Sequence, residues 1–181
     1  MAELPVLAGN DLVLRPLGDG DQSLYVALYS DSETMARAMP ALDAAGALRA
    51  FRREREGPCR AETQRLTWTL SDVRDDTAFG LLGLVLDNER GAEVGVVLPP
   101  EHQGRGRATQ AIALVARHAF EHLALERLYT RHAQGHEPAR GLMLRLGFAP
   151  APGGQPPHPV RWTLTREAWL AARRDKTGPF S

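Results

Sequence analysis

Cysteine is almost absent from the sequence, because Cys59 is the only one in 181 residues. A single thiol excludes an intrachain disulfide and is too few for a zinc or iron–sulfur site, so we expect no metal and a reducing compartment. Long apolar runs are also absent, and the first residues, MAELPVLAGND, lack a basic segment followed by an apolar one. The sequence therefore predicts a cytoplasmic protein with no membrane-spanning segment and no secretion signal.

Neither sign of charge predominates in the sequence. The 22 basic and 22 acidic side chains give a formal net charge of +0 at pH 7. The chain lacks the overall positive charge that draws proteins to nucleic acids or anionic membranes, so neither is expected as a partner, and any polyanion must be bound locally. No internal repeat or linker is recognisable, and 43% hydrophobic content suits one core. We expect one domain over residues 1–181.

Apolar residues follow both strand and helix periods. Alternation and short apolar runs predict strands at 11–17, 65–70, 77–86, 92–98, 127–133 and 160–165. Helical spacing predicts helices at 21–31, 41–56 and 137–147, and a further helix whose buried stripe is Ile112, Val115, Ala116, Ala119 and Leu123. The order is mixed α/β, with antiparallel strands first and then a strand–helix–strand crossover that returns its strand in parallel.

Residues 95–120, GVVLPPEHQGRGRATQAIALVARHAF, join a strand to a helix through a loop rich in glycine and arginine. The start of a helix presents unpaired N–H groups and about half a positive charge, which favour an anion. Gly104 and Gly106 leave the backbone uncovered, and Arg105 and Arg107 add positive charge. The pattern indicates a diphosphate site, and a solvated turn before a structural helix is the alternative.

The usual nucleotide-binding motifs do not occur in the sequence. There is no G-x-x-x-x-G-K-S/T, and no G-x-G-x-x-G opens a first strand–helix crossover, so a nucleoside triphosphate or NAD is not expected. Residues 103–108, QGRGRA, instead resemble the acetyl-CoA loop of the GNAT acetyltransferases, Q/R-x-x-G-x-G/A.

The surrounding sequence resembles the RimJ/RimL-like branch of that family, which modifies ribosomal-protein N-termini. The segments EVGVVLPPEHQGRGRATQA, FEHLALERLYTRHAQGHEPARGLMLRLGF and VRWTLTREAW are similar to its strand and glycine loop, its helix–strand–helix ending in Gly-Phe, and its closing strand. The resemblance covers residues 11–169 and is strongest over 92–148.

The fold that this resemblance implies is α/β, with a mixed, mostly antiparallel central sheet of about seven strands and helices on both faces. A splayed parallel pair of strands would form the cofactor site. Helices on the acceptor side would occupy residues 21–60, the acetyl-CoA core residues 77–148, and a closing strand and tail residues 149–181.

The activity that the resemblance implies is transfer of acetyl from acetyl-CoA, a cosubstrate, to an amine of a protein N-terminus or a small molecule. The implied cofactor-binding residues are Val97, Leu98, Gln103, Gly104, Arg105, Gly106, Arg107, Ala108 and Thr109. The first two would lie along the pantetheine arm, and the N–H groups of the others would hold the diphosphate. Two prolines after the strand would end its ladder, because proline donates no hydrogen bond. A homodimer is implied by the same likeness.

Two proton donors usual in the family are missing here. Where the family has Asn, Ser and Tyr around the last short helix, this sequence has His136, Ala139 and Met143. His136 is a candidate to bind the cofactor or protonate the departing thiolate, and a solvated surface histidine is the alternative. A thiol with a pKa of about 8.5 also leaves without an acid, because water can protonate it. The losses leave open a second function, a sensor that binds acetyl-CoA or CoA without transferring the acetyl group.

The candidate general base is Glu93, on the strand before the loop, acting directly or through water. The alternative is an edge glutamate paired with an arginine. His102 and His132 are reserve candidates. An α-amine with a pKa of about 8 is easier to deprotonate than a lysine at about 10.4, so an α-amine is the easier acceptor.

Two remaining features receive structural interpretations. Trp68, Trp162 and Trp169 are expected in the core or at its edge rather than as a stacking platform. Residues 151–159, APGGQPPHP, are interpreted as a connector, with a flap over the acceptor as the alternative.

Overall fold

The computed structural model describes residues 4–36, 38–56, 64–151 and 159–174. Within these ranges one sheet runs in the order β1-β2-β3-β4-β5-β6-β8-β7. Its strands are β1 (Leu7–Ala8), β2 (Leu12–Pro16), β3 (Arg65–Asp72), β4 (Ala78–Leu86), β5 (Gly91–Val97), β6 (Arg127–His132), β7 (Ala149–Pro150) and β8 (Val160–Thr165). Every neighbouring pair is antiparallel except β5 and β6. The predicted mixed sheet is confirmed, and it exceeds about seven strands because the two-residue strands β1 and β7 are too short to show alternation.

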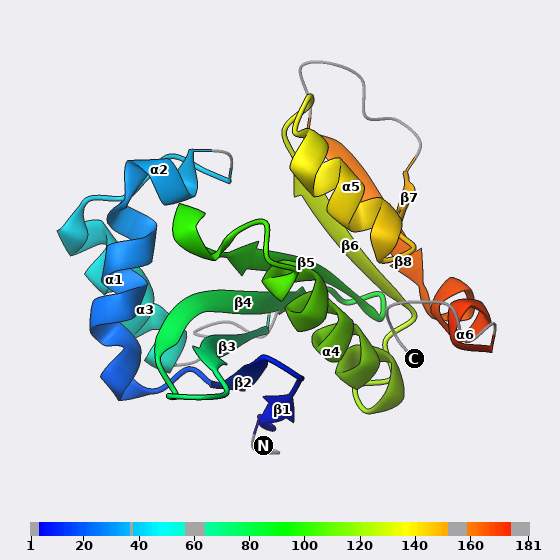
Figure 1. The fold of residues 1–181 in the computed structure, drawn as a ribbon, viewed down its shortest axis with the longest axis horizontal. Helices are drawn as coiled ribbons and strands as arrows, with labels where there is room; N and C mark the ends of the chain where they lie inside the picture. The colour runs from blue at the N-terminus through cyan, green and yellow to red at the C-terminus, as the bar shows by residue number, and fades with distance from the viewer. Residues whose placement is uncertain (1–3, 37, 57–63, 152–158, 175–181) are drawn as a thin grey trace.

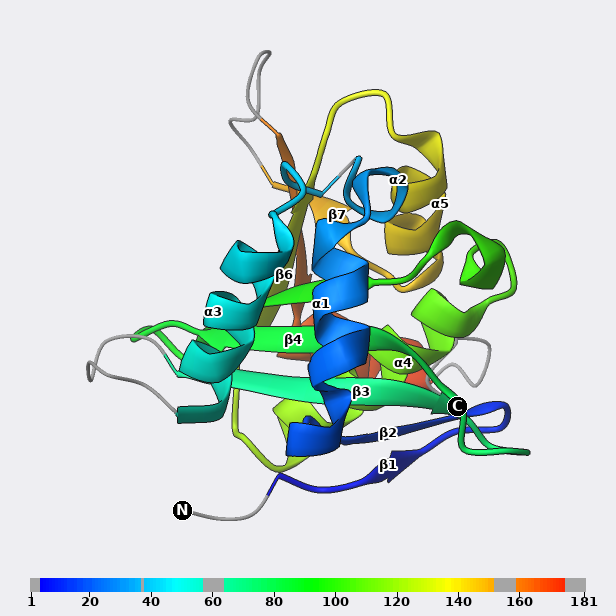
Figure 2. The same cartoon turned by 90° about the vertical axis from the view of Figure 1, so that its left-hand side faces the viewer.

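Helices cover both faces of this sheet. In the described ranges they are α1 (Gln22–Ser30), α2 (Ser32–Met35), α3 (Ala44–Glu56), α4 (Arg107–Glu121), α5 (Glu137–Arg145) and α6 (Arg166–Arg174). Figures 1 and 2 show α1 and α3 side by side across one face, over β3 and β4, and α4 and α5 on the opposite face. None of these helices is both long enough and apolar enough to cross a bilayer.

The apolar stripe of α4 packs against the sheet as predicted. Ile112, Val115, Ala116 and Ala119 are at most 2% exposed, and Leu123 is half-buried just beyond the helix end. They belong to the larger core cluster, which continues through β2, β3 and β4. Removing these side chains from water provides about 25 cal/mol for each Å² of apolar surface, which fixes α4 on its strands.

Alternation along β5 defines what each face of the sheet presents at the splayed strands. Ala92 and Val94 are buried in the larger cluster under α4. Val97 instead contacts a smaller cluster formed with α1 and α3. Because successive side chains of a strand point to opposite faces, Glu93, Gly95 and Val97 share the face that bears α1 and α3.

The last described helix was not predicted. The strand predicted at residues 160–165 is confirmed as β8, which ends at Thr165, and α6 follows directly where the sequence predicted no helix. The Thr165 hydroxyl accepts a hydrogen bond from Ala168 N–H at 3.2 Å, which satisfies one free donor of the first helical turn. Trp169 is then buried on the Phe120 ring, 5.3 Å between centroids. The part of the closing-strand resemblance beyond Thr165 is therefore helical and packs one tryptophan into the core.

The acceptor-side segment contains three helices where two were expected. The extra helix α2 is short, and its start is capped by the Asp31 carboxylate, which accepts a hydrogen bond from Thr34 N–H at 2.7 Å. Four residues are too few for a periodic apolar pattern, so periodicity does not predict this helix.

The interpretation of the tryptophans as core is confirmed, because Trp68, Trp162 and Trp169 are each at most 4% exposed. The connector or flap at 151–159 lies mostly outside the described residues.

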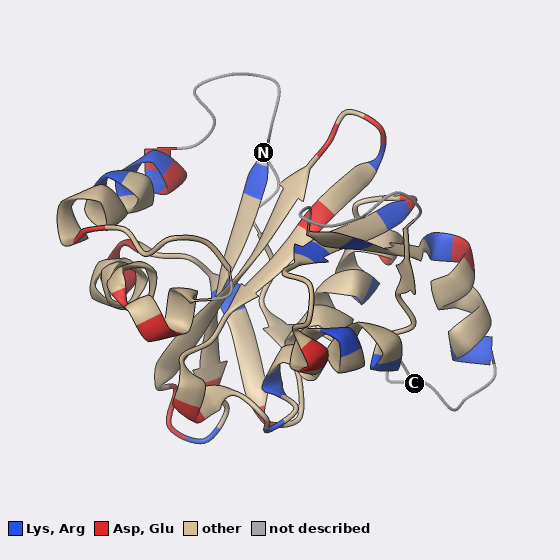
Figure 3. Ribbon diagram, turned by 90° about the horizontal axis from the view of Figure 1, so that it is seen from above, with Lys and Arg blue, Asp and Glu red and all other residues tan. Residues whose placement is uncertain are grey.

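Charged residues of both signs are interspersed over the ribbon (Figure 3). Buried Asp21 shows how they are used structurally. Its carboxylate accepts hydrogen bonds from both terminal nitrogens of Arg15 at 2.7 Å, from Gly18 N–H at 2.8 Å and from the Thr69 hydroxyl at 2.9 Å. This network fixes the start of α1 on β2 and β3.

Candidate active site

The parallel ladder between β5 and β6 ends partway along both strands. It contains the pairs Gly91–Arg127, Ala92–Leu128 and Glu93–Tyr129. Beyond them β5 continues to Val97, paired only with β4, and β6 continues to His132, paired only with β8. In these two fully described strands the facing edges past Glu93 and Tyr129 thus have no strand partner. Such edges can hydrogen-bond an extended chain of amides inserted between them.

The glycine loop, residues 103–106, follows β5 after a turn of 3-10 helix at Pro100–His102. Gly104 and Gly106 have φ angles of 71° and 76°, in the left-handed region where side chains other than glycine are strained. A Cβ atom placed on either would meet no heavy atom within 4 Å. The loop therefore needs glycine for its conformation and has open space above its backbone.

Unpaired N–H groups extend from this loop into the first turn of α4. The earliest amide there with a backbone partner is Gln110, which donates to the Gly106 carbonyl at 3.0 Å. Within the described part of the chain, no hydrogen bond to a protein acceptor is found for the amides of residues 104–109. Free donors at the positive end of a helix are suited to an anion such as a diphosphate.

Gln103 and Leu98, two of the predicted cofactor-binding residues, hold the start of the glycine loop in place. Gln103 donates its side-chain N–H to the Leu98 carbonyl at 2.8 Å, which closes the turn between strand and loop. The backbone N–H of Gln103 donates to the Pro100 carbonyl at 3.1 Å, so the expectation that this amide binds the diphosphate was wrong. Leu98 directly follows β5, and its side chain is buried against Gly80. Only the backbone of Leu98 is therefore accessible to a ligand.

Arg105 in the glycine loop and Arg107 at the start of α4 have different surroundings. The Arg107 guanidinium lies 3.0 Å from the Asp72 carboxylate, contacts His102 Nδ1 and stacks over the Phe79 ring at 4.3 Å. Burial lowers the pKa of His102, and the positive charge of Arg107 lowers it further. Arg105 is exposed and has no ion-pair partner among the described residues. Arg105 is thus the arginine whose charge is available to a ligand at the loop.

Glu93 occupies the last pair of the parallel ladder, where the strands begin to separate. Both of its carboxylate oxygens accept hydrogen bonds from Arg131, one of them from Nε at 3.0 Å. Its side chain is 29% exposed. The alternative interpretation, a glutamate paired with an arginine, therefore describes its contacts. Glu93 also lies where β5 and β6 begin to separate, which is the position expected of the base.

His136 lies on the other side of the sheet from Glu93, directly before α5. Its ring meets the His132 ring edge to face, 6.0 Å between centroids, and His132 stacks on Trp162 at 5.9 Å. Met143 is buried in the core and has no proton to donate. The structure therefore does not bring the two catalytic candidates together, and places one on each face of the sheet.

Sequence reasoning missed the partners that hold these residues. Asp72 is 35 positions from Arg107, and no local pattern connects them. Strand alternation places Arg131 and Tyr129 on one face of β6, but only the β5–β6 register, which pairs Tyr129 with Glu93, makes it the face of Glu93. In the described ranges, no cluster of three or more His, Cys, Asp or Glu side chains could hold a metal ion.

Comparison with known proteins agrees with this geometry. A family model for the acetyltransferase (GNAT) domain matches residues 11–149. The chain therefore belongs to the GNAT acetyltransferases, and it is an acyl-CoA-dependent N-acetyltransferase.

Individual relatives span most or part of the chain. The uncharacterized N-acetyltransferase YoaA of Bacillus subtilis (strain 168) is 25% identical over 154 residues, which are 80% of this chain and 82% of YoaA. Spermidine N(1)-acetyltransferase of Escherichia coli (strain K12) is 36% identical over 77 residues, 41% of each chain. Spermidine N-acetyltransferase from Vibrio cholerae, solved in complex with CoA and spermine, superposes with a TM-score of 0.73 at 22% identity and covers 88% of this chain and 98% of its own.

Proposed function

We propose that the protein transfers the acetyl group of acetyl-CoA to a primary amine, either a protein N-terminal α-amine or the amine of a small molecule, by direct attack. The observation that carries this proposal is the end of the β5–β6 ladder at Glu93–Tyr129 beside a glycine loop with free amides. A strand edge and a helix start are thus adjacent, one suited to a pantetheine arm and the other to a diphosphate.

The residues present fit acetyl-CoA as cosubstrate. The amides of residues 104–109 would bind the diphosphate, with Arg105 adding positive charge from solvent. The free edge of β5 up to Val97 and the Leu98 backbone would pair with the amides of pantetheine. In this arrangement the side chains of Gln103 and Arg107 position the loop through Leu98 and Asp72, and only the backbone amide of Arg107 faces the phosphates.

The chemistry required of the chain is modest. The amine nitrogen forms a bond to the thioester carbon, the carbon–sulfur bond breaks, and the amine loses one proton. Backbone N–H groups along the unpaired edge of β5 are available to stabilise the oxyanion. An α-amine with a pKa of about 8 is partly neutral at pH 7, which limits the work of a base.

The two catalytic candidates have separate tasks in this proposal. Glu93 accepts the proton of the amine through a water molecule, because both of its oxygens are already hydrogen-bonded by Arg131. His136, directly before α5, is the candidate to protonate the thiolate, with water as the other donor.

The finer placement in the RimJ/RimL-like branch and a cytoplasmic location are also part of the proposal. The order of strand, proline pair and glycine loop supports the branch, and the single Cys59 suits a reducing compartment. The acceptor remains a primary amine in general, since the relatives that name spermidine are matched over 41% of this chain or are below 25% identity.

Binding of acetyl-CoA is tested at Gly106, with a matched pair of variants. Asn and Asp both tolerate positive φ, and they differ mainly in charge. We expect calorimetry to show at least about tenfold weaker acetyl-CoA binding for Gly106→Asp than for Gly106→Asn, because the carboxylate faces the bound phosphates. Equal affinities for the two variants would contradict this placement of the diphosphate.

Transfer is tested by the release of free thiol from acetyl-CoA with a panel of peptides and small amines. We expect turnover with at least one amine. Retained binding of acetyl-CoA without turnover across the panel would favour the sensor, which the buried Met143 in place of a proton donor first suggested.

A further inference from the structure

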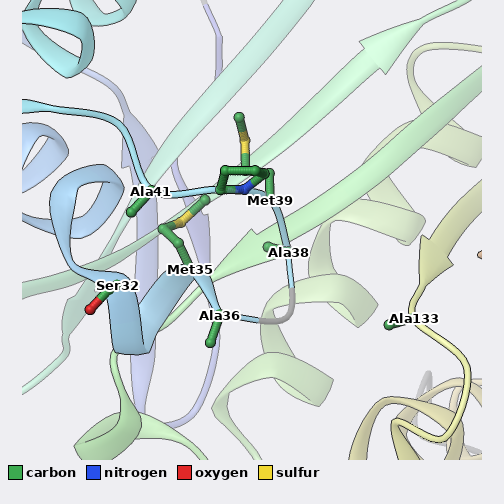
Figure 4. Close-up of a pocket in the computed structure, with 8 residues that line it drawn as sticks. Ser32, Met35, Ala36, Ala38, Met39, Ala41 and Ala133 are labelled. Carbon is green, nitrogen blue, oxygen red and sulfur yellow. The ribbon is translucent and has the colours of Figure 1, made fainter.

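A pocket of about 480 Å³ opens where the splayed strands end. Figure 4 shows its lining approaching from two sides, from α2 with the segment that follows it and, across the space, from Ala133. Ala133 directly follows β6. Figure 1 shows α2 and the end of β6 on either side of the carboxyl end of β5. The pocket is therefore at the open end of the gap between β5 and β6.

The described side chains that line this pocket are uncharged, and all of them except Ser32 are apolar. Its described members are four alanines, two methionines, one proline and one serine, with no charged side chain among them. Met35 is buried, and Met39 is 46% exposed. Methionine is unbranched and polarizable, so it adapts to apolar groups of different shape. Such walls favour an uncharged body next to the reacting amine.

The acidic residues near the pocket are not among its lining residues. The carboxylates of Asp31 and Asp43 accept hydrogen bonds from Thr34 N–H at 2.7 Å and from Gly46 N–H at 2.6 Å, at the starts of α2 and α3. Glu33 is exposed on α2 and is not one of the lining residues. Among the described residues, no carboxylate lines the pocket to pair with a second ammonium group.

The adjoining face of the sheet carries more cationic than anionic groups. Glu93 is neutralised by Arg131. Arg161 lies over the Tyr129 ring, 4.1 Å from its centroid. A polyamine entering beside these arginines would bring further positive charge to them, and an ammonium buried without a partner is costly.

We propose that this pocket receives the body of the acceptor, and that the acceptor is a monoamine with an uncharged, apolar body rather than a polyamine. The inference rests on the proposed transfer of acetyl to an amine. By this proposal the chain prefers a different acceptor from its spermidine-acetylating relatives, because no described carboxylate lines the pocket at the end of the gap between β5 and β6.

The test compares the kcat/KM of three acceptors, hexylamine, cadaverine and spermidine. Hexylamine and cadaverine have the same length, but the far end is a methyl group in one and an ammonium in the other. We expect kcat/KM for hexylamine to exceed that for cadaverine by at least about tenfold, since the pocket solvates the methyl group and not the ammonium.

Met39 provides a matched pair of variants, because its exposure leaves the fold tolerant of polar substitution. Met39→Glu places a carboxylate at the pocket, and Met39→Gln gives nearly the same shape without charge. Relative to Met39→Gln, we expect Met39→Glu to lower the ratio of hexylamine to cadaverine kcat/KM by at least about fivefold.

The outcomes separate the pocket from the transferase activity. Equal or faster transfer to cadaverine or spermidine by the unmodified protein would overturn the assignment of the pocket and leave the transferase intact. An unchanged ratio between the two Met39 variants would do the same. Absence of transfer to every amine, with acetyl-CoA still bound, would instead contradict the proposed function itself.

Discussion

Arg107 Nη2 lies 3.0 Å from Asp72 Oδ2, which ties the first residue of α4 to the last residue of β3. Both side chains are largely shielded from solvent, 12% and 13% exposed, and the guanidinium also stacks on Phe79. A loop arginine that the sequence suggests as a phosphate ligand is thus held by the protein itself. Its neighbour Arg105 is exposed.

The contrast between these arginines gives a paired prediction. We expect Arg107→Gln to lower both the melting temperature and the affinity for acetyl-CoA, the latter by about five- to tenfold, because the loop loses its anchor. Arg105→Gln should leave the melting temperature unchanged and weaken binding mainly at low ionic strength, since its effect is an exposed charge. Calorimetry at two salt concentrations and thermal melts distinguish the two. The same salt dependence in both variants would contradict the anchoring role.

The role of Glu93 as base is tested against its ion pair. If a water on its carboxylate accepts the amine proton, Glu93→Gln should lower kcat by about a hundredfold or more and leave acetyl-CoA binding unchanged. Arg131→Gln removes the same ion pair but keeps the carboxylate, so we expect a much smaller loss. Initial rates at saturating acetyl-CoA measure both. Equal losses in the two variants would show that the pair, and not the base, is what matters.

His118 makes stability depend on pH. It is 8% exposed on α4, its Nε2 has no hydrogen-bond partner among the residues that the structure describes, and its ring meets Trp68 edge to face and stacks on His122. Burial lowers the pKa of His118, and the neighbouring His122 lowers it further. Since the unfolded chain then binds the proton more readily, the contribution of neutral His118 to stability is complete above the ordinary pKa of about 6.5 and falls as pH decreases below it.

Urea denaturation at pH 7.5 and pH 5.5 checks this dependence. We expect the free energy of unfolding to fall less between these pH values in His118→Gln than in the unmodified protein, because glutamine does not titrate. His122→Gln, which removes a neighbour but leaves the buried imidazole, should retain most of the fall. An unaltered pH dependence in His118→Gln would contradict this assignment.

Patterns that repeat within one element were sufficient to predict much of the fold. The stripe of α4 and the alternation of β5 both repeat with the period of their own element, so periodicity identified them. The conformation of Gly104 and Gly106 also follows from local backbone freedom. Local patterns were therefore sufficient to predict the glycine loop and the strand before it.

Features that depend on distant residues were not accessible in the same way. The pairing of Asp72 with Arg107 and the packing of Trp169 on Phe120 join segments that only the folded chain brings together. The short helix α2 is set by one capping carboxylate, Asp31, and not by a period. The pocket that we propose for the acceptor is lined partly by α2 and the segment after it, so the sequence did not identify the acceptor.

The approach of the acceptor is tested at Gly95. This residue is exposed in β5 between Glu93 and Val97, and a Cβ atom placed on it would meet nothing within 4 Å. A side chain there would extend over the α1 and α3 face, into the space beside Glu93. Gly80, on the neighbouring strand, is the opposite case, since a Cβ atom would lie 2.5 Å from the Leu98 side chain and 2.9 Å from the Val97 carbonyl.

We therefore expect Gly95→Ala and Gly95→Phe to keep the melting temperature and the affinity for acetyl-CoA, the latter within about threefold. Their kcat/KM for an amine should fall with side-chain size, by about tenfold or more for phenylalanine, because the acceptor and the new ring compete for the same space. Gly80→Ala should lower the melting temperature instead. Full amine activity in Gly95→Phe would mean that the acceptor reaches the thioester without crossing this face, since a ring at that position obstructs any path beside Glu93.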